Sequence, residues 1–370
     1  MEIYIHIPFC IKKCNYCAFN SITATNDIIN DYVEALCKEI EIKSSSELIE
    51  TIYIGGGTPT ILEINQLAKI FEALNKNFDL THCIEITVEA NPGTVDQNYF
   101  ENLRRLGVNR ISLGVQTFDD RLLKIIGSIH NRIEAITAIN SAKKFFENVS
   151  IDLMYDLPDQ NLKILSESID LAMNFDIKHI SIYGLEIEPN TNFFEISDKL
   201  NLPSNDESLA MYEFIIAELP KNNFQRYEIS NFAKKNFESH HNLGYWSDVN
   251  YLGLGASAHS YDGSIRRSNV ASVNDYINGI KNDRDVSIIE EIITQQAAIE
   301  EFCFLALRKV EGIDKQKFQK KFGFNIETVF EKVLSKLIAE KLIIQSNNFI
   351  RLTDLGMQFG NKVFAEFLID

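Results

Sequence analysis

The sequence predicts an α/β fold: a partial (β/α) barrel over residues 1–230, a connecting segment over 231–290, and a smaller helical, winged-helix-like domain over 291–370. Two observations predict it. Over the first 230 residues, apolar β-rich runs alternate with helical stretches at a spacing of about 30–45 residues, which is typical of parallel βα units that form a doubly wound sheet or close toward a barrel. Proline usage then changes, because all seven prolines precede residue 221.

Six strands are expected in the first region. They are residues 3–7, 52–54, 84–89, 110–115, 150–154 and 179–183, separated by helical stretches such as 28–42 and 95–106. Five prolines lie at or just beyond a strand end, where the missing N–H interrupts no ladder: Pro8, Pro59, Pro92, Pro158 and Pro189. Residues 186–205, with two prolines and several asparagines, form the longest expected loop.

The C-terminal region is expected to be mainly helical. Its apolar pattern predicts helices over 299–307, 315–322 and 326–340, a hairpin formed by 342–345 and 349–352, and a last helix. Helices followed by a two-stranded wing are similar to a small winged-helix module. Because fold alone does not confer function, this likeness does not by itself predict DNA binding.

Composition and charge exclude several classes of protein. A content of 45% hydrophobic and 24% charged residues is typical of a packed globular chain, not of a disordered or fibrous one. The formal charge of −16 disfavours nucleic-acid binding, which relies on Lys and Arg to neutralise phosphates. Because no run of roughly 18 apolar residues and no basic leader occurs, we expect a cytoplasmic protein.

The six cysteines are unevenly distributed. Cys10, Cys14 and Cys17 form a C-x3-C-x2-C motif directly after the first strand, whereas Cys37, Cys83 and Cys303 are scattered and expected to be buried thiols. This pattern favours a metal site in a reducing compartment over a disulfide framework. Three thiolates on a short loop can bind three irons of a cubane cluster and leave the fourth iron open. The alternative is a zinc site completed by His6, although strand alternation favours a buried histidine there.

Polar or glycine-rich segments follow several of the predicted strands. Gly55, Gly56 and Gly57, followed by Thr58 and Pro59, indicate a backbone that approaches a ligand closely or adopts positive φ. The next four strands end at or near Glu89, Gln116, Asp152 and Tyr183. In a parallel barrel all carboxyl ends of strands share one rim, where active sites are built, so these groups and the cysteine loop should converge. For a single carboxylate, capping of the next helix is the alternative.

The motif Tyr4-Ile5-His6-Ile7-Pro8-Phe9-Cys10-x3-Cys14-x-Tyr16-Cys17 resembles the radical S-adenosylmethionine signature of the oxygen-independent coproporphyrinogen III oxidase family. The resemblance continues in order through residues 55–59, 89–94, 113–116, 152–158 and 226–232 and covers most of the chain. It implies a radical S-adenosylmethionine barrel with a [4Fe-4S] cluster on Cys10, Cys14 and Cys17, whose unique iron is chelated by S-adenosyl-L-methionine. It also implies contacts to that ligand from Tyr4, Gly56, Gly57, Thr58, Glu89, Gln116 and Asp152.

Two positions depart from the family pattern. Ser128 stands where members usually have an arginine, twelve residues beyond Gln116, so one cationic contact to the ligand is missing and a lower affinity is expected. Asp156 stands where the family prefers glycine, which leaves the conformation of the 155–159 turn open.

Other features resemble the heme chaperone branch of this family. Phe19 stands where the oxidases have a fourth cysteine, and a signature that begins at residue 4 leaves no room for their N-terminal arm. Residues 241–246 match the HNxxYW box of the chaperone branch. Histidine is a common axial heme ligand, so His241, with the aromatic rings of Tyr245 and Trp246, is the first candidate to bind heme, and His240 is the second. The alternative is that His241 and Trp246 pack between the barrel and the C-terminal domain.

The resemblance thus implies a heme chaperone that binds heme and transfers it to acceptor apoproteins, respiratory heme proteins among them. Its cofactors would be a [4Fe-4S] cluster, S-adenosyl-L-methionine and heme; nucleic acid is not expected as a partner, and homodimer formation stays open. The alternative is radical decarboxylation of coproporphyrinogen III to protoporphyrinogen IX. Phe19 argues against that reaction, no catalytic residue is assigned, and whether the protein is an enzyme stays open. A zinc-stabilised binding protein is the third class.

Overall fold

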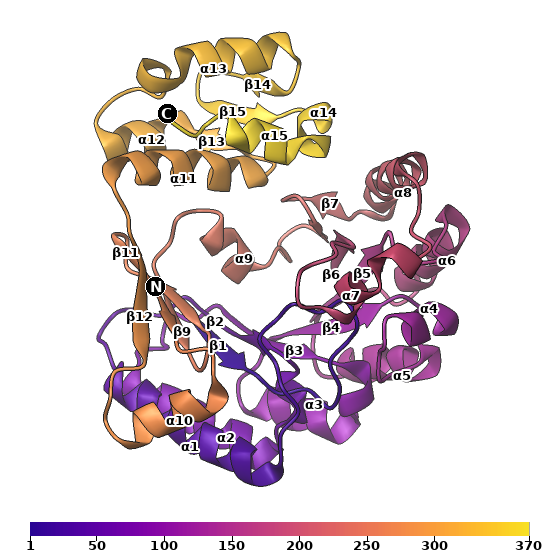
Figure 1. The fold of residues 1–370 in the computed structure, drawn as a ribbon, viewed down its shortest axis with the longest axis vertical. Helices are drawn as coiled ribbons and strands as arrows, with labels where there is room; N and C mark the ends of the chain where they lie inside the picture. Colours follow the sequence, from indigo (N-terminus) through magenta and orange to yellow (C-terminus); the bar gives the residue numbers. More distant parts are fainter. Residues whose placement is uncertain (370) are drawn as a thin grey trace.

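The computed structural model describes residues 1–369, and its main element is a curved twelve-stranded sheet with helices on its outer face (Figure 1). The strand order is β12-β11-β10-β9-β1-β2-β3-β4-β5-β6-β8-β7, and the run from β9 to β6 is parallel. The six strands predicted from the sequence form its centre: β1 (Glu2–Ile7), β2 (Thr51–Gly56), β3 (Glu85–Ala90), β4 (Arg110–Gln116), β5 (Asn148–Tyr155) and β6 (His179–Gly184). The expected α/β fold with a parallel sheet is confirmed.

Helices connect these strands and cover the outer face of the sheet. They are α1 (Asn26–Ile42), α2 (Ile64–Asn77), α3 (Gln97–Arg105), α4 (Asp120–Ile125), α5 (Arg132–Ala142), α6 (Leu162–Met173), α7 (Asn192–Glu195) and α8 (Asn205–Glu218). Short 3-10 turns occur at Pro59–Ile61, Pro92–Thr94, Ser197–Lys199 and Leu219–Asn222. The expected loop over 186–205 therefore holds α7 and one such turn.

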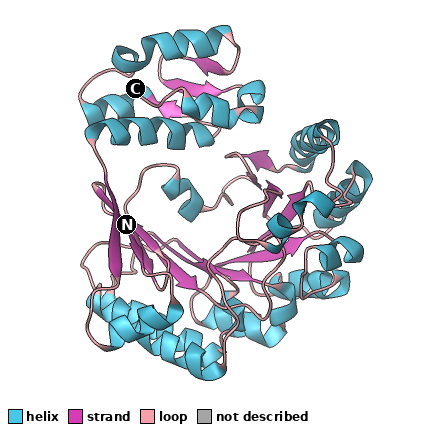
Figure 2. Ribbon diagram, in the orientation of Figure 1, coloured by secondary structure: helices cyan, strands magenta, loops and turns pink. Residues whose placement is uncertain are grey.

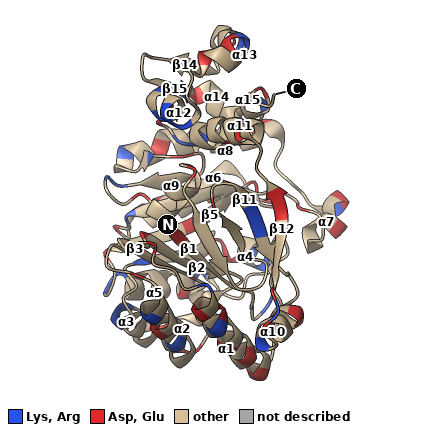
Figure 3. Cartoon of the chain, turned by 90° about the vertical axis from the view of Figure 1, so that its left-hand side faces the viewer, with Lys and Arg blue, Asp and Glu red and all other residues tan. Residues whose placement is uncertain are grey.

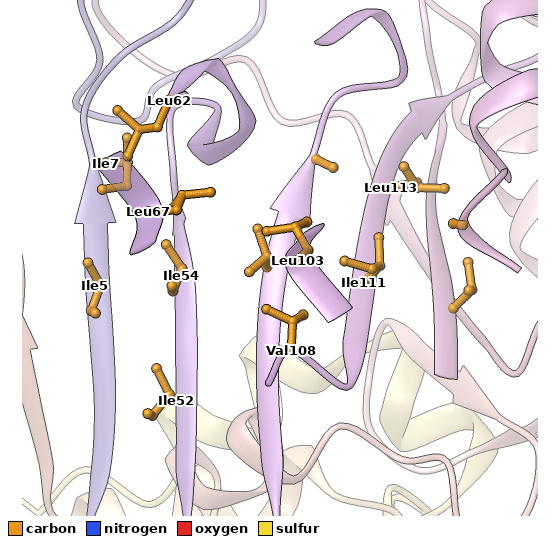
Figure 4. Packing of buried hydrophobic residues seen from close by; sticks show 14 of the residues in the cluster. Ile5, Ile7, Ile52, Ile54, Leu62, Leu67, Leu103, Val108, Ile111 and Leu113 are labelled. Atoms are coloured by element: carbon orange, nitrogen blue, oxygen red, sulfur yellow. The ribbon is translucent and has the colours of Figure 1, made fainter. Parts of the chain in front are cut away.

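Alternation along the strands separates an apolar face from a polar one. Figure 4 shows Ile5 of β1 and Ile54 of β2 in line with Leu67 of α2 and Leu103 of α3, all within one buried core. Successive side chains of a strand point to opposite faces, so the intervening residues point to the concave side. That side carries Tyr4 and His6 of β1, and it is where the candidate site is built.

Residues 231–290, expected to connect two domains, contribute strands to the main sheet instead. After β7 (Gln225–Arg226), the elements are β8 (Asn231–Ala233), α9 (His240–Tyr245), β9 (Tyr251–Leu254), β10 (His259–Tyr261), β11 (Ile265–Asn269), α10 (Val273–Lys281) and β12 (Ser287–Ile292). β9 pairs in parallel with β1, and α10 is linked to α1 by the Lys281–Asp31 ion pair at 2.9 Å. The physical reason is shared burial, because Leu254 and Tyr276 belong to the same apolar core as β1 and β2.

The C-terminal region has a core of its own. It comprises α11 (Gln295–Arg308), β13 (Ile313–Asp314), α12 (Lys315–Phe322), α13 (Glu327–Ala339), β14 (Ile343–Gln345), β15 (Phe349–Leu352), α14 (Asp354–Gln358) and α15 (Gly360–Ala365). Figure 2 shows its small sheet, of order β13-β15-β14, lying among these helices. The predicted helices and hairpin are present, but the last helix is divided at Phe359, whose φ of −110° and ψ of 31° are not helical.

The distribution of charged side chains and the hydropathy of the helices agree with the composition of the sequence. Figure 3 shows Lys and Arg interspersed with Asp and Glu along α1, α2 and α3. Within residues 1–369, no helix is both long and apolar enough to cross a membrane.

Candidate functional site

The cysteine loop follows β1 at the rim formed by the carboxyl ends of the parallel strands. Backbone hydrogen bonds fix it: the Cys10 N–H donates to Ile22 O at 3.0 Å and the Asn15 N–H donates to Ile126 O at 2.9 Å. The three cysteines are half-buried free thiols. Burial, followed by the neighbouring Cys17, raises the pKa of Cys14 to about 12. The positive charge of bound metal is what removes the protons from such thiols.

The zinc alternative that used His6 is not supported by the geometry. His6 is buried, and its ring nitrogens are hydrogen-bonded to the Tyr4 hydroxyl at 3.1 Å and to Asn20 O at 2.8 Å. Within residues 1–369, no group of three or more His, Cys, Asp or Glu side chains converges as a site for a metal ion. Both ring nitrogens of His6 are thus already engaged, so His6 does not complete a zinc site with the three thiolates.

The three consecutive glycines let β2 end directly against the cysteine loop. A Cβ on Gly57 would lie 2.6 Å from Phe9 O and 3.0 Å from Cys10 Sγ. Gly56 has a φ of +115°, and a Cβ there would lie 2.7 Å from the His6 ring. A larger residue at position 57 would displace the loop, and one at position 56 would meet the His6 ring in a backbone conformation that favours glycine. The bare backbone at this rim can therefore approach both the loop and a bound ligand.

Glu89, at the end of β3, joins this glycine segment. Its Oε1 accepts a hydrogen bond from the Tyr53 hydroxyl at 2.7 Å, and its Oε2 accepts one from the Gly56 N–H at 3.2 Å. Burial raises the pKa of Glu89 to about 7, and the nearby charge of Asp152 adds to the rise. The carboxylate is thus an acceptor held against the bare backbone of the glycine segment.

Asp152 and Gln116 complete the rim from the next strands. Ser112 Oγ lies 3.1 and 3.2 Å from the two carboxylate oxygens of Asp152 and can donate to either, while burial raises the pKa of this group. Gln116 has a φ of +63°, and the ladder between β4 and β5 shifts register there. Tyr4 stacks on Tyr53, with ring centroids 6.2 Å apart. Gly56, Gly57, Glu89 and Gln116 thus lie at the carboxyl-end rim with Thr58, whose Oγ1 is 3.7 Å from Cys10 Sγ, whereas Tyr4 and Asp152 lie within β1 and β5.

The two departures from the family pattern have clear structural outcomes. Ser128 Oγ is hydrogen-bonded to His130 Nδ1 at 2.9 Å, and His130 Nε2 is hydrogen-bonded to Val115 O at 3.2 Å. The serine therefore braces the end of β4. Asp156 adopts a φ of +63°, so the turn keeps the left-handed conformation that glycine favours, which aspartate tolerates better than most residues.

The HNxxYW box lies at the opposite, amino-terminal rim of the parallel strands. His241 is 1% exposed, and its ring nitrogens are hydrogen-bonded to Thr51 Oγ1 at 2.8 Å and to the Tyr245 hydroxyl at 3.2 Å. Burial lowers its pKa to about 3, so the ring is neutral. Its ring also stacks on Tyr53, at 5.1 Å between centroids. An axial heme ligand needs a free nitrogen, so the geometry does not support His241 in that role; it packs α9 into the sheet.

Trp246 forms the contact between α9 and the C-terminal domain. The Arg308 guanidinium, in the last turn of α11, lies 4.8 Å from the Trp246 ring centroid and 5.4 Å from that of Phe364. Trp246 therefore packs at the boundary of the two regions, as the packing alternative predicted. Tyr245, half-buried, contacts both His241 and Tyr251.

Sequence reasoning did not single out the polar residues on the concave face of the sheet. Tyr53 contacts both Glu89 and His241, and Arg110 is 1% exposed, with no hydrogen-bond partner for its Nε among residues 1–369. Although burial opposes its charge, Glu85 and other nearby groups raise the Arg110 pKa. Strand alternation could have placed both residues on this face. Each lies an even number of positions along its strand from another residue that points inward.

Comparisons with known proteins agree with these features. Residues 4–172 match the model of the radical SAM superfamily, and residues 293–359 match that of the HemN C-terminal domain. The heme chaperone HemW of Bacillus subtilis is 40% identical, covering 99% of this chain and 98% of that protein; that of Lactococcus lactis is 38% identical, covering 99% and 97%. The solved structure of the coproporphyrinogen III oxidase HemN from Escherichia coli has a TM-score of 0.87 at 23% identity, covering 99% of this chain and 89% of that one, which is a likeness of fold.

Proposed function

Because this chain belongs to the heme chaperone HemW family within the radical SAM superfamily, we propose that it binds heme and transfers it to acceptor proteins. The observation that carries the proposal is similarity over the whole chain to relatives that bear this name. It agrees with Phe19, which occupies the position of the oxidases' fourth cysteine and is 67% exposed. An exposed phenyl ring cannot replace a thiol as an iron ligand.

The donor set at the carboxyl-end rim supports two further cofactors. We propose that Cys10, Cys14 and Cys17 hold a [4Fe-4S] cluster, which when bound supplies a redox centre with one iron free for S-adenosyl-L-methionine. The residues expected to hold that ligand are Tyr4, Gly56, Gly57, Thr58, Glu89, Gln116 and Asp152. Of these, Glu89 and Asp152 offer carboxylate oxygens to hydroxyl or ammonium groups, and the glycines leave the backbone accessible.

The acceptors and the setting are also proposals. All six cysteines are free, which suits the reducing cytoplasm. We expect the acceptors to be apoproteins of respiratory heme proteins. An exchange assay, in which the heme-loaded protein is mixed with an apo-cytochrome and the Soret band of the product is followed, tests the transfer.

The central experiment is anaerobic reconstitution with iron and sulfide, followed by a heme titration. We expect one cluster per chain by iron and sulfide analysis, and saturable heme binding. A variant with all three loop cysteines changed to alanine is the matched control for the cluster, and should contain no cluster iron. Failure of the parent protein to bind stoichiometric heme would contradict the chaperone proposal.

The oxidase alternative is tested on the same preparation. The reduced, reconstituted protein is incubated with S-adenosyl-L-methionine and coproporphyrinogen III, and the products are separated by chromatography. We expect no protoporphyrinogen IX. Its formation at a rate proportional to the protein concentration would establish the decarboxylase instead.

A further inference from the structure

Five tyrosine rings and one histidine ring form a continuous row of aromatic contacts that starts in β1 and ends in β10. Tyr4 and Tyr53 lie 6.2 Å apart between ring centroids. The His241 ring lies 5.1 Å from that of Tyr53 and 4.9 Å from that of Tyr245. Two more steps, of 4.9 and 6.1 Å, lead through Tyr251 to Tyr261. We refer to five of these residues as the tyrosine row: Tyr4, Tyr53, Tyr245, Tyr251 and Tyr261.

The tyrosine row joins two regions of the molecule. Tyr4 belongs to the strand that leads into the cysteine loop, and it is one of the residues expected around S-adenosylmethionine. At the other end, the Tyr261 hydroxyl donates to Asp248 Oδ1 at 3.1 Å, and Asp248 is ion-paired with Lys321 of the C-terminal domain. Tyr251, next to Tyr261, is half-buried, so a small molecule in solvent can reach this end of the row.

Four of the five hydroxyls in the row lie against a side chain that can take up a proton. The pairs are Tyr4 with His6 Nδ1 at 3.1 Å, Tyr53 with Glu89 Oε1 at 2.7 Å, Tyr245 with His241 Nε2 at 3.2 Å, and Tyr261 with Asp248 Oδ1 at 3.1 Å. A proton passes directly between two heavy atoms that are about 2.6–3.2 Å apart. All four pairs are within this range.

The two histidines can each accept from their tyrosine. His6 Nε2 lies 2.8 Å from the carbonyl oxygen of Asn20, which only accepts, so Nε2 carries the ring proton and Nδ1 accepts from Tyr4. Thr51 Oγ1, 2.8 Å from His241 Nδ1, can accept in the same way and leave Nε2 for Tyr245. Burial lowers the pKa of His241 to about 3. An oxidised phenol is a much stronger acid than a neutral one, so it still gives its proton to this ring.

Packing alone does not require these partners. A buried tyrosine needs only one hydrogen-bond acceptor, and Tyr99 has the carbonyl oxygen of Leu62 at 2.7 Å. A carbonyl cannot take up the phenolic proton. A buried phenol that lost an electron and kept its proton would carry an uncompensated charge in the interior, which is costly. A carboxylate or imidazole partner removes that cost, so the row is suited to oxidation and not only to packing.

We propose that the tyrosine row carries oxidising equivalents from the cysteine-loop region toward the boundary with the C-terminal domain, and so removes organic radicals that escape from the cluster site. This inference rests on the proposed function for the source of the radical. Phenols lose electrons only to strong oxidants, so the row does not supply electrons to reduce a cluster. Its direction is therefore outward for oxidising equivalents.

Each step moves one electron, with one proton exchanged locally. The organic radical gains an electron from Tyr4 and a proton from water, which leaves hydroxide, and the phenolic proton of Tyr4 moves to His6. Tyr53 then reduces Tyr4, which recovers its proton from His6, while the proton of Tyr53 moves to Glu89. Tyr245 reduces Tyr53 in the same way across the His241 ring.

The last steps return the row to its starting state. The electron vacancy passes from Tyr245 to Tyr251 and Tyr261, where Asp248 takes the proton. A thiol in solution then supplies one electron at the half-buried Tyr251, Asp248 returns its proton to Tyr261, and the thiol proton neutralises the hydroxide. The net reaction converts the organic radical and a thiol into the reduced organic molecule and a thiyl radical.

The test is laser flash photolysis of the full-length chain with a ruthenium polypyridyl sensitiser attached through Phe19→Cys. Position 19 suits the label, because Phe19 is 67% exposed and the neighbouring Asn20 carbonyl contacts His6, the proton acceptor of Tyr4. The other half-buried thiols are changed to serine, namely Cys10, Cys14, Cys17, Cys37 and Cys83. A cobalt(III) ammine accepts the excited electron irreversibly, which leaves ruthenium(III) as the oxidant. A nitroso spin trap then marks the oxidised tyrosines, which peptide mass spectrometry locates.

We expect the labelled chain to form a tyrosyl radical, detected by electron paramagnetic resonance, and a trap adduct on Tyr251. Tyr53→Phe should lose the Tyr251 adduct and shift it to Tyr4, because the row is interrupted. Glu89→Gln, which keeps an acceptor but removes the base, should do the same. Tyr99→Phe is the matched control for loss of a phenolic hydroxyl outside the row, and it should keep the Tyr251 adduct.

The outcomes separate this inference from the proposed function, because the photochemical test needs no cluster, S-adenosyl-L-methionine or heme. An equal amount of Tyr251 adduct in the labelled chain and in Tyr53→Phe, with the circular dichroism unchanged, would overturn the row as a path. Absence of the Tyr251 adduct from the labelled chain itself would also overturn it. Either result leaves the chaperone proposal standing, whereas failure of the parent protein to bind heme contradicts only that proposal.

Discussion

Replacing Tyr53 by phenylalanine tests whether the charge on Glu89 depends on one hydrogen bond. The Tyr53 hydroxyl donates to Glu89 Oε1 at 2.7 Å. Burial raises the pKa of Glu89 to about 7, and the bond from Tyr53 is the largest of the interactions that oppose a further rise. Removing the hydroxyl leaves the phenyl ring in place, so the stacking on Tyr4 and His241 is retained.

The expected magnitude follows from the charge on the acceptor. A hydrogen bond to a charged group contributes about 1.5–3 kcal/mol, and one pKa unit corresponds to about 1.4 kcal/mol, so the substitution should raise the pKa of Glu89 by roughly one to two units. Near pH 7.5 the carboxyl would then change from mostly ionised to mostly protonated. Because a neutral carboxyl is a weaker acceptor, affinity for S-adenosyl-L-methionine should fall by roughly three- to twentyfold at that pH and recover above pH 9.

The assay is equilibrium dialysis of the ligand against reconstituted protein from pH 6 to pH 9.5. Tyr99→Phe is the matched control, because it removes a hydroxyl that donates at 2.7 Å to Leu62 O and does not contact Glu89. The pH at which ligand affinity is half-maximal should be the same in the control as in the parent. An unchanged midpoint in Tyr53→Phe would refute the reasoning, because Glu89 would then be held by other groups or would not contact the ligand.

Three further substitutions test other parts of the structure. Gly57→Ala should abolish cluster incorporation, measured as bound iron, because its Cβ would meet Phe9 O at 2.6 Å; Gly93→Ala, with its nearest neighbour at 3.4 Å, should keep its iron. Glu2→Gln should stabilise the protein by about 1–3 kcal/mol near pH 8 and little near pH 4.5, measured by urea unfolding. Burial raises the pKa of Glu2 to about 8, and a raised carboxyl pKa costs stability as pH rises above the unfolded value of 4.5. Equal effects at both pH values would contradict this. Asp156→Gly should leave the turn intact and change stability by less than about 1 kcal/mol, since relief of the left-handed strain offsets the entropy of glycine; strong destabilisation would show that the Asp156 side chain holds the turn.

Local sequence signals predicted the centre of the fold well. The six parallel strands follow alternating or continuous apolar runs bounded by Gly and Pro, so they can be located without knowing their partners. The position of the cysteines, the glycines and the strand-end carboxylates at one rim then follows from parallel topology alone. The motifs identified which residue types belong to the site, and the parallel order of the strands explains why these residues lie close together.

Long-range pairing was not predictable in the same way. β9 has four residues and pairs with a strand about 250 positions earlier, so residues 231–290 were expected to be a connection. The HNxxYW motif gives the spacing of His241 and Tyr245 but not the rim on which α9 lies. Burial of the histidine depends on Thr51, a residue that is remote in sequence and has no distinctive neighbours.

The pairing of β1 between β2 and β9 has a consequence for synthesis of the chain. β1 leaves the ribosome well before β9, so one of its edges stays unpaired until residues Tyr251–Leu254 have been made. The cysteine loop grows directly from that strand and is held partly by contacts to later segments, such as the Asn15–Ile126 hydrogen bond. Domains fold as units once their long-range contacts can form. The loop therefore reaches its final shape only after residues 251–254 have been made, and metal loading is expected to follow their synthesis.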